Sequence, residues 1–275
     1  MKKLITLFLG IILLAAPLVF ADEQTRDNAP AQSPAMLLDQ TYNEIRNILH
    51  EMHESLEVAK DELSAVGIQG EKATAALQKL YEANKHAFDC GTINPDGVIV
   101  GVAPKEMSYI LGMDISHQEQ IKRLKKTHEP VVSTAIDTVE GFVGFDLQHP
   151  VFDQKGLYIG SVSILTEPDF FGSVITHKVA NFPVEIWMMQ KDGRIIYDTN
   201  PEEIGKNLFT DKLYANYPSL IAVGHEMAKS AKGQSHYMFL DKELRETVRK
   251  ELIWTTIELH GTEFRLALAY LKKDF

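Results

Sequence analysis

Hydrophobic residues between Met36 and Gly67 recur in alternating steps of four and three. The repeating positions are Ile45, Leu49, Met52, Leu56, Ala59, Leu63 and Val66. This period predicts one long helix with a narrow hydrophobic seam, and a second helix over Glu71–Lys85 after the glycines that interrupt the first. The seam could pack on the chain's own sheet, or it could pair with a second chain in a homodimer through the N-terminal helix. The sequence leaves both arrangements open.

Beyond these helices the chain becomes strand-like, rich in turns and repetitive. An Asp-Gly turn, a helical stretch and two strands follow one another twice, at an offset of roughly 90 to 105 residues. In the first copy the helical stretch and strands are Gln118–Lys126, Gly141–Gln148 and Gly156–Leu165, with His149–Lys155 joining the strands. In the second copy they are Ser219–Ala231, Gly233–Leu240 and the region Leu252–Tyr270, which turns at His260-Gly261. The glycines that recur are Gly97, Gly112, Gly141 and Gly156, with counterparts in Gly193, Gly205, Gly233 and Gly261.

The turns of this repeat predict the type of sheet. Asp-Gly between hydrophobic runs is a hairpin signal, because Gly tolerates the positive φ that the turn needs. Short hairpins make antiparallel sheets, and each helical stretch must then cross one face of its sheet. The predicted fold is α+β, a long N-terminal helix followed by two tandem units with antiparallel sheets. The predicted divisions are 1–21 (signal peptide), 22–35 (disordered leader), 36–90 (N-terminal helices), 91–168 (first unit) and 169–275 (second unit).

The first residues predict export. Lys2 and Lys3 precede the hydrophobic run Leu4–Phe20, and Ala21 stands where a signal peptidase would cut. A cleaved signal peptide, with a periplasmic or secreted mature protein, is the main expectation, and an uncleaved N-terminal membrane anchor is the alternative. The run is slightly short for a membrane span of about 20 residues. The following stretch Asp22–Ser33 is polar and is expected to be disordered.

Charge and cysteine content narrow the choice of partners. The chain has 28 basic and 38 acidic residues, and removing the signal peptide removes two lysines and changes the net charge from −10 to −12. Such a surface argues against nucleic acid as a partner, because phosphate binding needs clustered Lys and Arg. Cys90 is the only cysteine, so the chain cannot form an internal disulfide.

Several stretches in the second half resemble a known family. These are KDGRIIYDTNPEEIGKNLF, then KGQSHYMF with Gly233 and Tyr237, and WTTIELHGTEFRLALA. They are similar to the membrane-proximal unit of the double Cache family of extracellular PAS-like sensor domains. The first half resembles the membrane-distal unit of that family through DGVIVGVAP, GMDIS, EPVVS, EGFVGFDLQHPVFD and GLYIGSVSIL. The resemblance extends over nearly the whole predicted mature chain, and the order and spacing of these short stretches carry it.

The resemblance implies a sensor that binds a small molecule in its first unit. Most such domains lie between two membrane spans and drive a kinase, a cyclase or a chemoreceptor. Since nothing follows Phe275, we expect this chain to present its bound ligand to a separate membrane receptor or transporter. The branch of the family that binds amines and amino acids has Arg, Trp and Tyr after the helical stretch of its membrane-distal unit, which we call the excursion. It also has an Asp late in the last strand of that unit. Here KRLKKTHEPVVS lacks Trp and Tyr, and Leu165 stands at the place of that Asp, so an α-amino-acid ligand of that type is not expected.

The first unit contains the candidate ligand-binding residues. Arg123, Lys126 and His128 could reach over the pocket and hold an anionic ligand such as a carboxylate by charge-assisted bonds, or they could form a solvated helix face. Ser133 could add a neutral donor. Strand alternation places Asp146 on one sheet face and gives Ser161 and Ser163 a shared face. The opposite, hydrophobic face, which carries Phe145, Leu147, Val162 and Ile164, is expected to meet the long helix. Because buried polar groups need partners, Asp146 and the two serines predict a polar ligand or trapped water. The full set is Arg123, Lys126, His128, Ser133, Asp146, Ser161 and Ser163.

The second unit offers a weaker candidate site. Its polar and aromatic residues of note are Trp187, Tyr197, Asp198, Trp254 and Arg265. The alternative interpretation is that Trp254 belongs to the core and that Asp198 pairs with Arg265 across strands.

Motifs for metal binding and catalysis are not found in the sequence. His50-Glu51-Met52-His53 lacks the i, i+4 spacing of a helical zinc pair, so both histidines are expected to be solvated beside the seam. The other histidines show no ligand spacing, although distant ones could converge in the fold. A Gly-x-Ser-x-Gly elbow, a Walker loop and a Gly-x-Gly-x-x-Gly loop are absent from the sequence. The expected function is a ligand-binding sensor without cofactor or enzymatic activity; the alternatives are a dimeric scaffold and, less favoured, an enzyme on a sensor fold.

Overall fold

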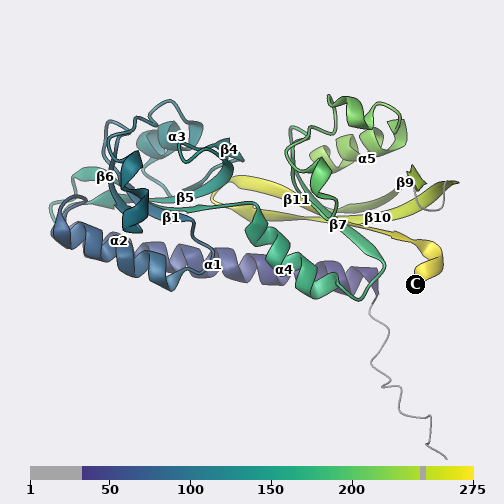
Figure 1. The fold of residues 1–275 in the computed structure, drawn as a ribbon, viewed down its shortest axis with the longest axis horizontal. Helices are drawn as coiled ribbons and strands as arrows, with labels where there is room; N and C mark the ends of the chain where they lie inside the picture. Colours follow the sequence, from purple (N-terminus) through teal and green to yellow (C-terminus); the bar gives the residue numbers. More distant parts are fainter. Residues whose placement is uncertain (1–32, 242–245) are drawn as a thin grey trace, which may run out of the picture. The chain divides into compact units, whose positions relative to one another are not determined.

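The computed structural model of the chain describes residues 33–241 and 246–275 (Figure 1). The predicted signal peptide and almost all of the predicted leader lie outside these residues. The α-helices are α1 (Pro34–Val66), α2 (Glu71–Ala83), α3 (Glu119–Thr127), α4 (Asp169–Val179) and α5 (Pro218–Lys229). Short 3-10 helices are η1 (Lys105–Ile110), η2 (Pro201–Glu203), η3 (Lys212–Tyr214) and η4 (Lys272–Asp274). Within the described ranges, no helix combines the length and the hydropathy that crossing a membrane would require.

The strands form two antiparallel sheets. The first contains β1 (Asp89–Ile93), β2 (Ile99–Ala103), β3 (Val131–Val132), β4 (Ile136–Asp137), β5 (Val143–Phe152) and β6 (Tyr158–Thr166), in the order β2-β1-β6-β5-β3 with β4 also paired to β5. The second contains β7 (Val184–Gln190), β8 (Ile195–Asp198), β9 (Gly233–Asp241), β10 (Glu246–Leu259) and β11 (Thr262–Leu271), in the order β8-β7-β11-β10-β9. We call β1–β6 with α3 the first unit, and β7–β11 with α5 the second unit.

Apart from the short strand β4 of the first sheet, the two sheets repeat the same path. Each unit begins with an Asp-Gly hairpin whose glycine has positive φ, +88° at Gly97 and +91° at Gly193. Each hairpin is followed by a second positive-φ glycine whose N–H donates back to the second strand, from Gly112 to Ile99 O at 2.9 Å and from Gly205 to Ile195 O at 2.8 Å. In the first unit α3 then precedes β3, β5 and β6, and in the second unit α5 precedes β9, β10 and β11. The predicted α+β fold with a long N-terminal helix and two antiparallel sheets is confirmed.

Helix α1 packs along both sheets with the predicted seam. It begins where Ser33 Oγ accepts a hydrogen bond from Met36 N, and it ends at Gly67, whose φ is +84°. Its contacts are with β5 and β6 of the first unit and with β10 and β11 of the second (Figure 1). The buried seam residues are Ile45, Leu49, Met52, Leu56, Ala59 and Leu63. The same-chain arrangement of the seam is therefore confirmed, and these side chains are not available to a second chain.

Each sheet buries hydrophobic residues on both faces. On the face toward α1 and α4, the core includes Phe145, Leu147, Val162 and Ile164, as the strand alternation predicted. On the opposite face, smaller cores lie beneath the excursions. The core beneath α5 contains Trp187, Met189, Leu220, Val223, Met227 and Trp254. The core of the first unit contains Ile93, Ile99, Val102, Met107, Ile110, Ile115 and Ile121. The two cavities described below also lie on this side of the sheets.

Strand β5 is longer than predicted. His149–Lys155 was expected to be a connection, but β5 continues to Phe152 and only Asp153–Gly156 turns. Pro150 is tolerated because β3 pairs only with Leu147 and Gln148, so β5 has become an edge on that side. The extension places His149 inside the sheet, with 1% of its surface exposed.

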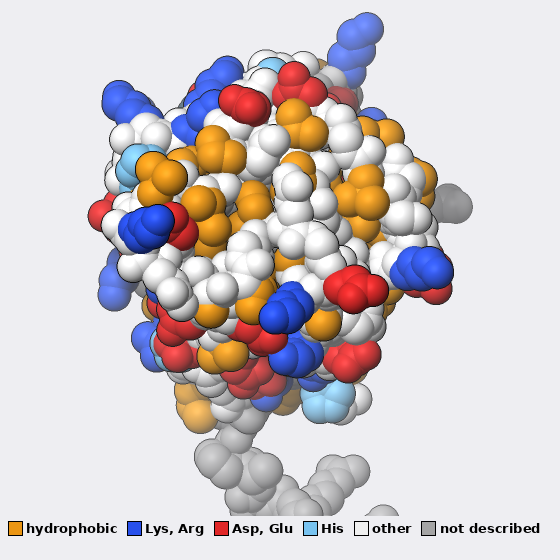
Figure 2. Space-filling view, turned by 90° about the vertical axis from the view of Figure 1, so that its left-hand side faces the viewer, with side chains coloured by type: hydrophobic (Ala, Val, Ile, Leu, Met, Phe, Trp, Pro, Cys, Tyr) orange, Lys and Arg blue, Asp and Glu red, His pale blue; other side chains and the backbone are white. Residues whose placement is uncertain are grey.

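The face of the first unit turned to the viewer in Figure 2 carries mixed charge. Acidic and basic side chains both lie around its rim, with hydrophobic side chains between them (Figure 2). This face does not present the uniformly basic surface that a nucleic acid would need.

Candidate functional site

A small cavity of about 40 Å³ lies in the first unit on the excursion side of the sheet. Its polar lining includes Asp89, Asp146, Ser163 and Glu140, and the remaining wall is mostly Ile and Val. Asp89 and Asp146 are the cross-strand partners of Leu165 on its two sides. Two acids thus flank Leu165, the position at which the resemblance implied an Asp.

The carboxyl groups of this cavity are difficult to ionise. Burial raises the pKa of Asp89 to about 8, with further contributions from Glu140 and Asp146. Burial likewise raises the pKa of Asp146 to about 7, although the amides of Gln148 and Gln120 donate to its Oδ2. Among the described residues, Asp89 Oδ2 and Asp146 Oδ1 have no hydrogen-bond partner. Since a water needs roughly 10–15 Å³ of such volume, the cavity has room for a few waters or a very small polar ligand.

The seven residues predicted for the site do not surround one cavity. Asp146 and Ser163 line the first-unit cavity, and Ser161 Oγ donates to Gln148 Oε1 at 3.2 Å beside it. Ser133 Oγ accepts from Asp146 N at 2.9 Å, and the residue lines a separate surface depression of about 400 Å³ together with Arg123 and Lys126.

The three predicted basic residues do not reach the first-unit cavity. The ring of His128 lies 4.6 Å from that of Tyr158, outside the cavity lining, and Lys126 is exposed. Arg123 Nη2 donates to Val132 O at 2.7 Å and also approaches His260 O and Thr262 Oγ1, each at 3.3 Å. Arg123 therefore connects α3 of the first unit to the β10–β11 turn of the second.

The larger pocket, about 530 Å³, lies in the second unit. Four carboxyl groups line it, those of Glu185, Asp198, Glu202 and Glu203. Five aromatic residues line it as well, namely Trp187, Tyr214, Tyr217, Tyr237 and Phe239. Among the described residues of its lining, Lys250 is the one basic side chain, and it is already paired with Glu185 and lies 4.4 Å from the centroid of the Phe239 ring. The pocket is therefore acidic and aromatic.

Burial also perturbs the acids of this pocket. The pKa of Asp198 is raised to about 8, chiefly by burial and then by Glu203, although Asn200 N donates to Asp198 Oδ1 at 2.7 Å. Glu203 Oε2 accepts a hydrogen bond from Tyr214 at 3.0 Å. The pKa of Tyr237 lies well above its ordinary value, because the hydroxyl is buried near Glu185 and Asp198. Tyr237 therefore stays neutral and can offer its hydroxyl hydrogen to a ligand.

The second-unit candidates from the sequence are only partly in this pocket. Trp187 and Asp198 line it, whereas Tyr197 packs into the core on the α1 side. Trp254 is a core residue, as the alternative interpretation held, and its Nε1 donates to Ser230 O at 3.1 Å. The predicted pair of Asp198 with Arg265 is wrong, since Arg265 donates to Met227 O and to Glu263 Oε2.

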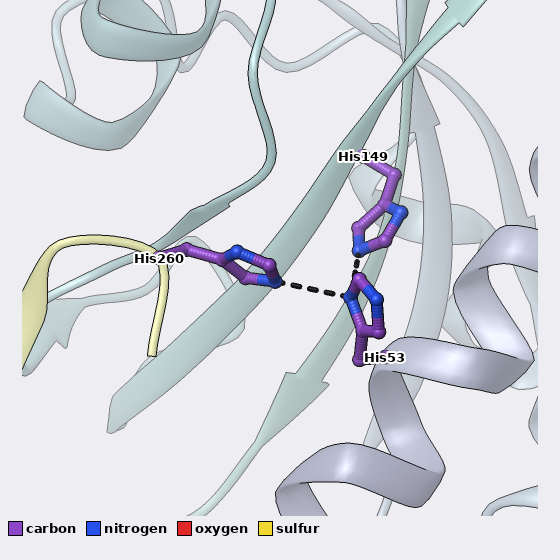
Figure 3. A group of neighbouring side chains, drawn as sticks. All are labelled: His53, His149 and His260. Carbon is purple, nitrogen blue, oxygen red and sulfur yellow. Dashed lines mark hydrogen bonds between the residues drawn. The ribbon is translucent and has the colours of Figure 1, made fainter. Parts of the chain in front are cut away.

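Three histidines that are distant in the sequence meet between α1 and the two sheets. His53 on α1, His149 on β5 and His260 in the β10–β11 turn point toward one another (Figure 3). His53 Nδ1 lies 3.0 Å from His149 Nε2 and 3.0 Å from His260 Nε2. Glu57 Oε1, one helical turn after His53, lies 2.7 Å from His149 Nδ1.

The environment keeps two of these rings neutral. Burial, followed by the charge of His53, lowers the pKa of His149 to about 4, and burial lowers the pKa of His260. The expectation that His53 would be solvated is wrong, because the ring is half-buried in this cluster. The expectation of no metal site rested on spacing along the chain, and that spacing does not detect a cluster whose members are 96 and 207 residues apart.

Comparison with known proteins agrees with the fold. Residues 47–168 match the family model described as HK/GC/Chemotaxis protein-like, sensor domain. The chain is 49% identical to an extracellular ligand binding receptor from Desulfohalobium retbaense, with a TM-score of 0.74, over 86% of this chain and 40% of that chain. It thus spans about two fifths of the length of that receptor. A comparison with curated proteins finds no match.

More distant solved structures share the fold. The ligand binding domain of the Pseudomonas aeruginosa amino acid chemoreceptor PctB, in complex with L-Arg, is 14% identical with a TM-score of 0.65, over 87% of this chain and 94% of that chain. The periplasmic sensory domain of the Campylobacter jejuni chemoreceptor Tlp1 is 10% identical with a TM-score of 0.60, over the same shares. The predicted resemblance to extracellular Cache-like sensor domains is therefore confirmed, with residues 47–168 matching the HK/GC/chemotaxis protein-like sensor domain family.

Proposed function

We propose that the chain is an extracellular sensor protein that binds a small metabolite carrying a cationic amine in the second-unit pocket. The bound state is then presented to a membrane receptor or transporter. The observation that carries the proposal is the pocket of about 530 Å³, lined by four carboxyl groups and five aromatic residues. Its volume falls within the roughly 300–1,000 Å³ typical of small-molecule sites.

The charge of the pocket selects the ligand class. Lys250 is engaged by Glu185, and no other basic side chain among the residues that the structure describes lines the pocket beside Asp198, Glu202 and Glu203. Aromatic faces attract cations, and Tyr217 and Phe239 are stacked with ring centroids 5.0 Å apart. A carboxylate ligand would meet unfavourable charge here, so the structure supports an amine rather than the anion that Arg123 and Lys126 first indicated.

Ligands of structural neighbours belong to a compatible chemical class. Those structures contain L-Gln or L-Arg with PctB, GABA with PctC, and L-alanine with CtaA. All of these molecules carry an amine and a carboxylate, so it is their amine end that matches the charge of the second-unit pocket. Their proteins are under 15% identical to this chain, so the likeness supports the general class and not a particular ligand.

The first-unit cavity is the second candidate for a ligand. The unpaired oxygens Asp89 Oδ2 and Asp146 Oδ1 are suited to a hydrogen-bond donor, but about 40 Å³ admits a metabolite only if the excursion moves outward. A scaffold that binds no ligand has no need of a polar cavity, so the polar lining does not favour that alternative.

A ligand screen tests the proposal. Thermal-shift measurements on the purified protein would compare choline, GABA and basic amino acids with dicarboxylates, followed by calorimetry. We expect amines alone to raise Tm, and Asp198→Asn to weaken binding at least tenfold, equivalent to about 1.4 kcal/mol. Asp146→Asn is the matched control in the first unit. Binding of dicarboxylates only would contradict the proposal, and loss of amine binding in Asp146→Asn only would move the site to the first unit.

Presentation to a membrane protein needs its own experiment. Crosslinking of the protein to membranes of the source organism, with and without the identified amine, should yield a ligand-dependent adduct. The same adduct in equal amount without ligand, or with Asp198→Asn, would contradict presentation while leaving ligand binding intact.

A further inference from the structure

In the histidine cluster, three ring nitrogens lie so close together that N–H···N hydrogen bonds cannot pair all of them. His53 Nδ1 approaches His149 Nε2 and His260 Nε2 at 3.0 Å each, and the three nitrogens lie within 4.8 Å of one another (Figure 3). One Nδ1 hydrogen cannot satisfy both neighbours in good geometry, since hydrogen bonds require near-linear alignment.

Glu57 biases the tautomer of His149. Glu57 Oε1 lies 2.7 Å from His149 Nδ1, although the two atoms do not meet hydrogen-bond geometry among the described residues, so the carboxylate charge favours a proton on Nδ1 and a lone pair on Nε2, the nitrogen that faces His53. A carboxylate on the outer nitrogen of a histidine is the usual support for a metal ligand, where it fixes the ring and raises its basicity. Glu57 is held in turn by Lys60, which binds its other oxygen.

Two of the three nitrogen–nitrogen separations are close to those around a metal ion, and the third is no more than 4.8 Å. With metal–nitrogen bonds of about 2.0–2.1 Å, two nitrogens of a tetrahedral site are about 3.3–3.4 Å apart. The two approaches of 3.0 Å are only slightly shorter. We propose that His53, His149 and His260 bind one divalent transition-metal ion of the zinc type, with a fourth position open to water or another ligand. Imidazole nitrogens suit zinc, copper and nickel, and a set of three histidines is a known zinc geometry.

Such an ion would connect three parts of the fold. His53 belongs to α1, His149 to the first sheet and His260 to the turn between the last two strands of the second sheet. His53 and His260 are only half-buried, which leaves a path for the ion. Binding would therefore stabilise the contact between the two units, because an ion that binds only the folded state shifts the unfolding equilibrium toward that state.

Metal titration of the purified protein tests the site. After dialysis against a chelator, zinc would be titrated in competition with a chromophoric chelator, and cobalt would be followed through its visible d–d absorption bands. We expect one ion per chain, a rise in Tm with zinc, and cobalt bands typical of a low-coordinate site with nitrogen ligands. Absence of cobalt bands and of competition for zinc would overturn the proposal, whatever the behaviour of variants.

Matched variants assign the ligands. His260→Asn keeps a residue that tolerates the positive φ of 48° and avoids repacking, and it should lower zinc affinity more than about 100-fold. Glu57→Gln should lower it by about 10–100-fold, the usual effect of losing an outer carboxylate. His50→Ala removes an exposed imidazole one helical turn from His53 and should change nothing. Unchanged affinity in His260→Asn, or equal loss in His50→Ala, would place the ion elsewhere and overturn the assignment.

Discussion

Arg123 of helix α3 donates a hydrogen bond to the carbonyl oxygen of His260, a residue 137 positions later in the chain. The same nitrogen bonds Val132 O within its own unit and approaches Thr262 Oγ1. The excursion of the first unit is thereby attached to the turn that carries one member of the histidine cluster. A basic side chain that resembled a ligand contact in the sequence is in the structure a connection between the units.

Loss of this connection should destabilise the protein. Arg123→Ala is expected to cost about 1.5–3 kcal/mol, the range for hydrogen bonds from a charged group, as measured by urea unfolding. Lys126→Ala on the same helix is the control, and because Lys126 is exposed its effect should stay within about 0.5 kcal/mol. Equal effects of the two substitutions would argue that the Arg123 contacts carry no stability.

The buried acid of the first unit should make stability depend on pH. Because burial raises the pKa of Asp89 from 3.8 to about 8, the folded protein binds more protons than the unfolded chain between these values, and stability falls as pH rises through that interval. Asp89→Asn should remove this part of the fall and raise Tm at pH 8 by several degrees relative to the unmodified protein, since each kcal/mol corresponds to about 2–4 °C.

Thermal unfolding at pH 5 and pH 8 checks the sign of this prediction. Asp153→Asn, at an exposed hairpin turn, is the control, and the difference in Tm between pH 5 and pH 8 should be the same for this variant as for the unmodified protein. A larger gain for Asp89→Asn at pH 5 than at pH 8 would show that the carboxyl is ionised in the folded protein.

Binding of a cation to the second-unit pocket should strengthen as pH rises toward 8. Asp198 has a pKa of about 8 in the ligand-free protein, so below that pH a cation must displace its proton, and affinity can rise by up to about tenfold per pH unit. Choline is the suitable probe because its charge does not titrate. Calorimetry from pH 6 to pH 9 should show the rise with the native residue and a flat profile with Asp198→Asn; a rise in both would assign the titration to another group.

The seam of α1 should behave as core. Leu56 is completely buried between α1 and the sheets, so Leu56→Ala should cost about 2–5 kcal/mol. Val58 on the same helix is 70% exposed, and Val58→Ala should be neutral or slightly stabilising because Ala has the higher helix propensity. Denaturant unfolding with light scattering checks both; a change of oligomeric state in Leu56→Ala without loss of stability would instead support pairing of the seam with a second chain.

Local pattern was enough to predict the elements and their repetition. The heptad spacing predicts α1, strand alternation predicts which faces of β5 and β6 meet it, and Asp-Gly turns at Gly97 and Gly193 predict the hairpins, because each depends only on residues close together in the chain. The order of these elements also carries the resemblance to sensor domains. Strand β5 is nevertheless longer than predicted. A proline such as Pro150 can lie in the strand only because β3 ends before it and leaves that side of β5 without a hydrogen-bonded neighbour.

Tertiary structure alone decided where the chemistry lies. The larger pocket is assembled from β7, β8, β9 and β10 and from loops after β8, whose side chains have no common spacing in the sequence. The histidine cluster joins one helix, one strand and one turn. The sequence identifies Arg123 as a basic residue, but the orientation of its side chain depends on the carbonyl group of His260 in the other unit. Sequence determined the local conformations of this protein, whereas its pocket and its metal-binding geometry arise from contacts between residues whose proximity only the packing of helix and sheets creates.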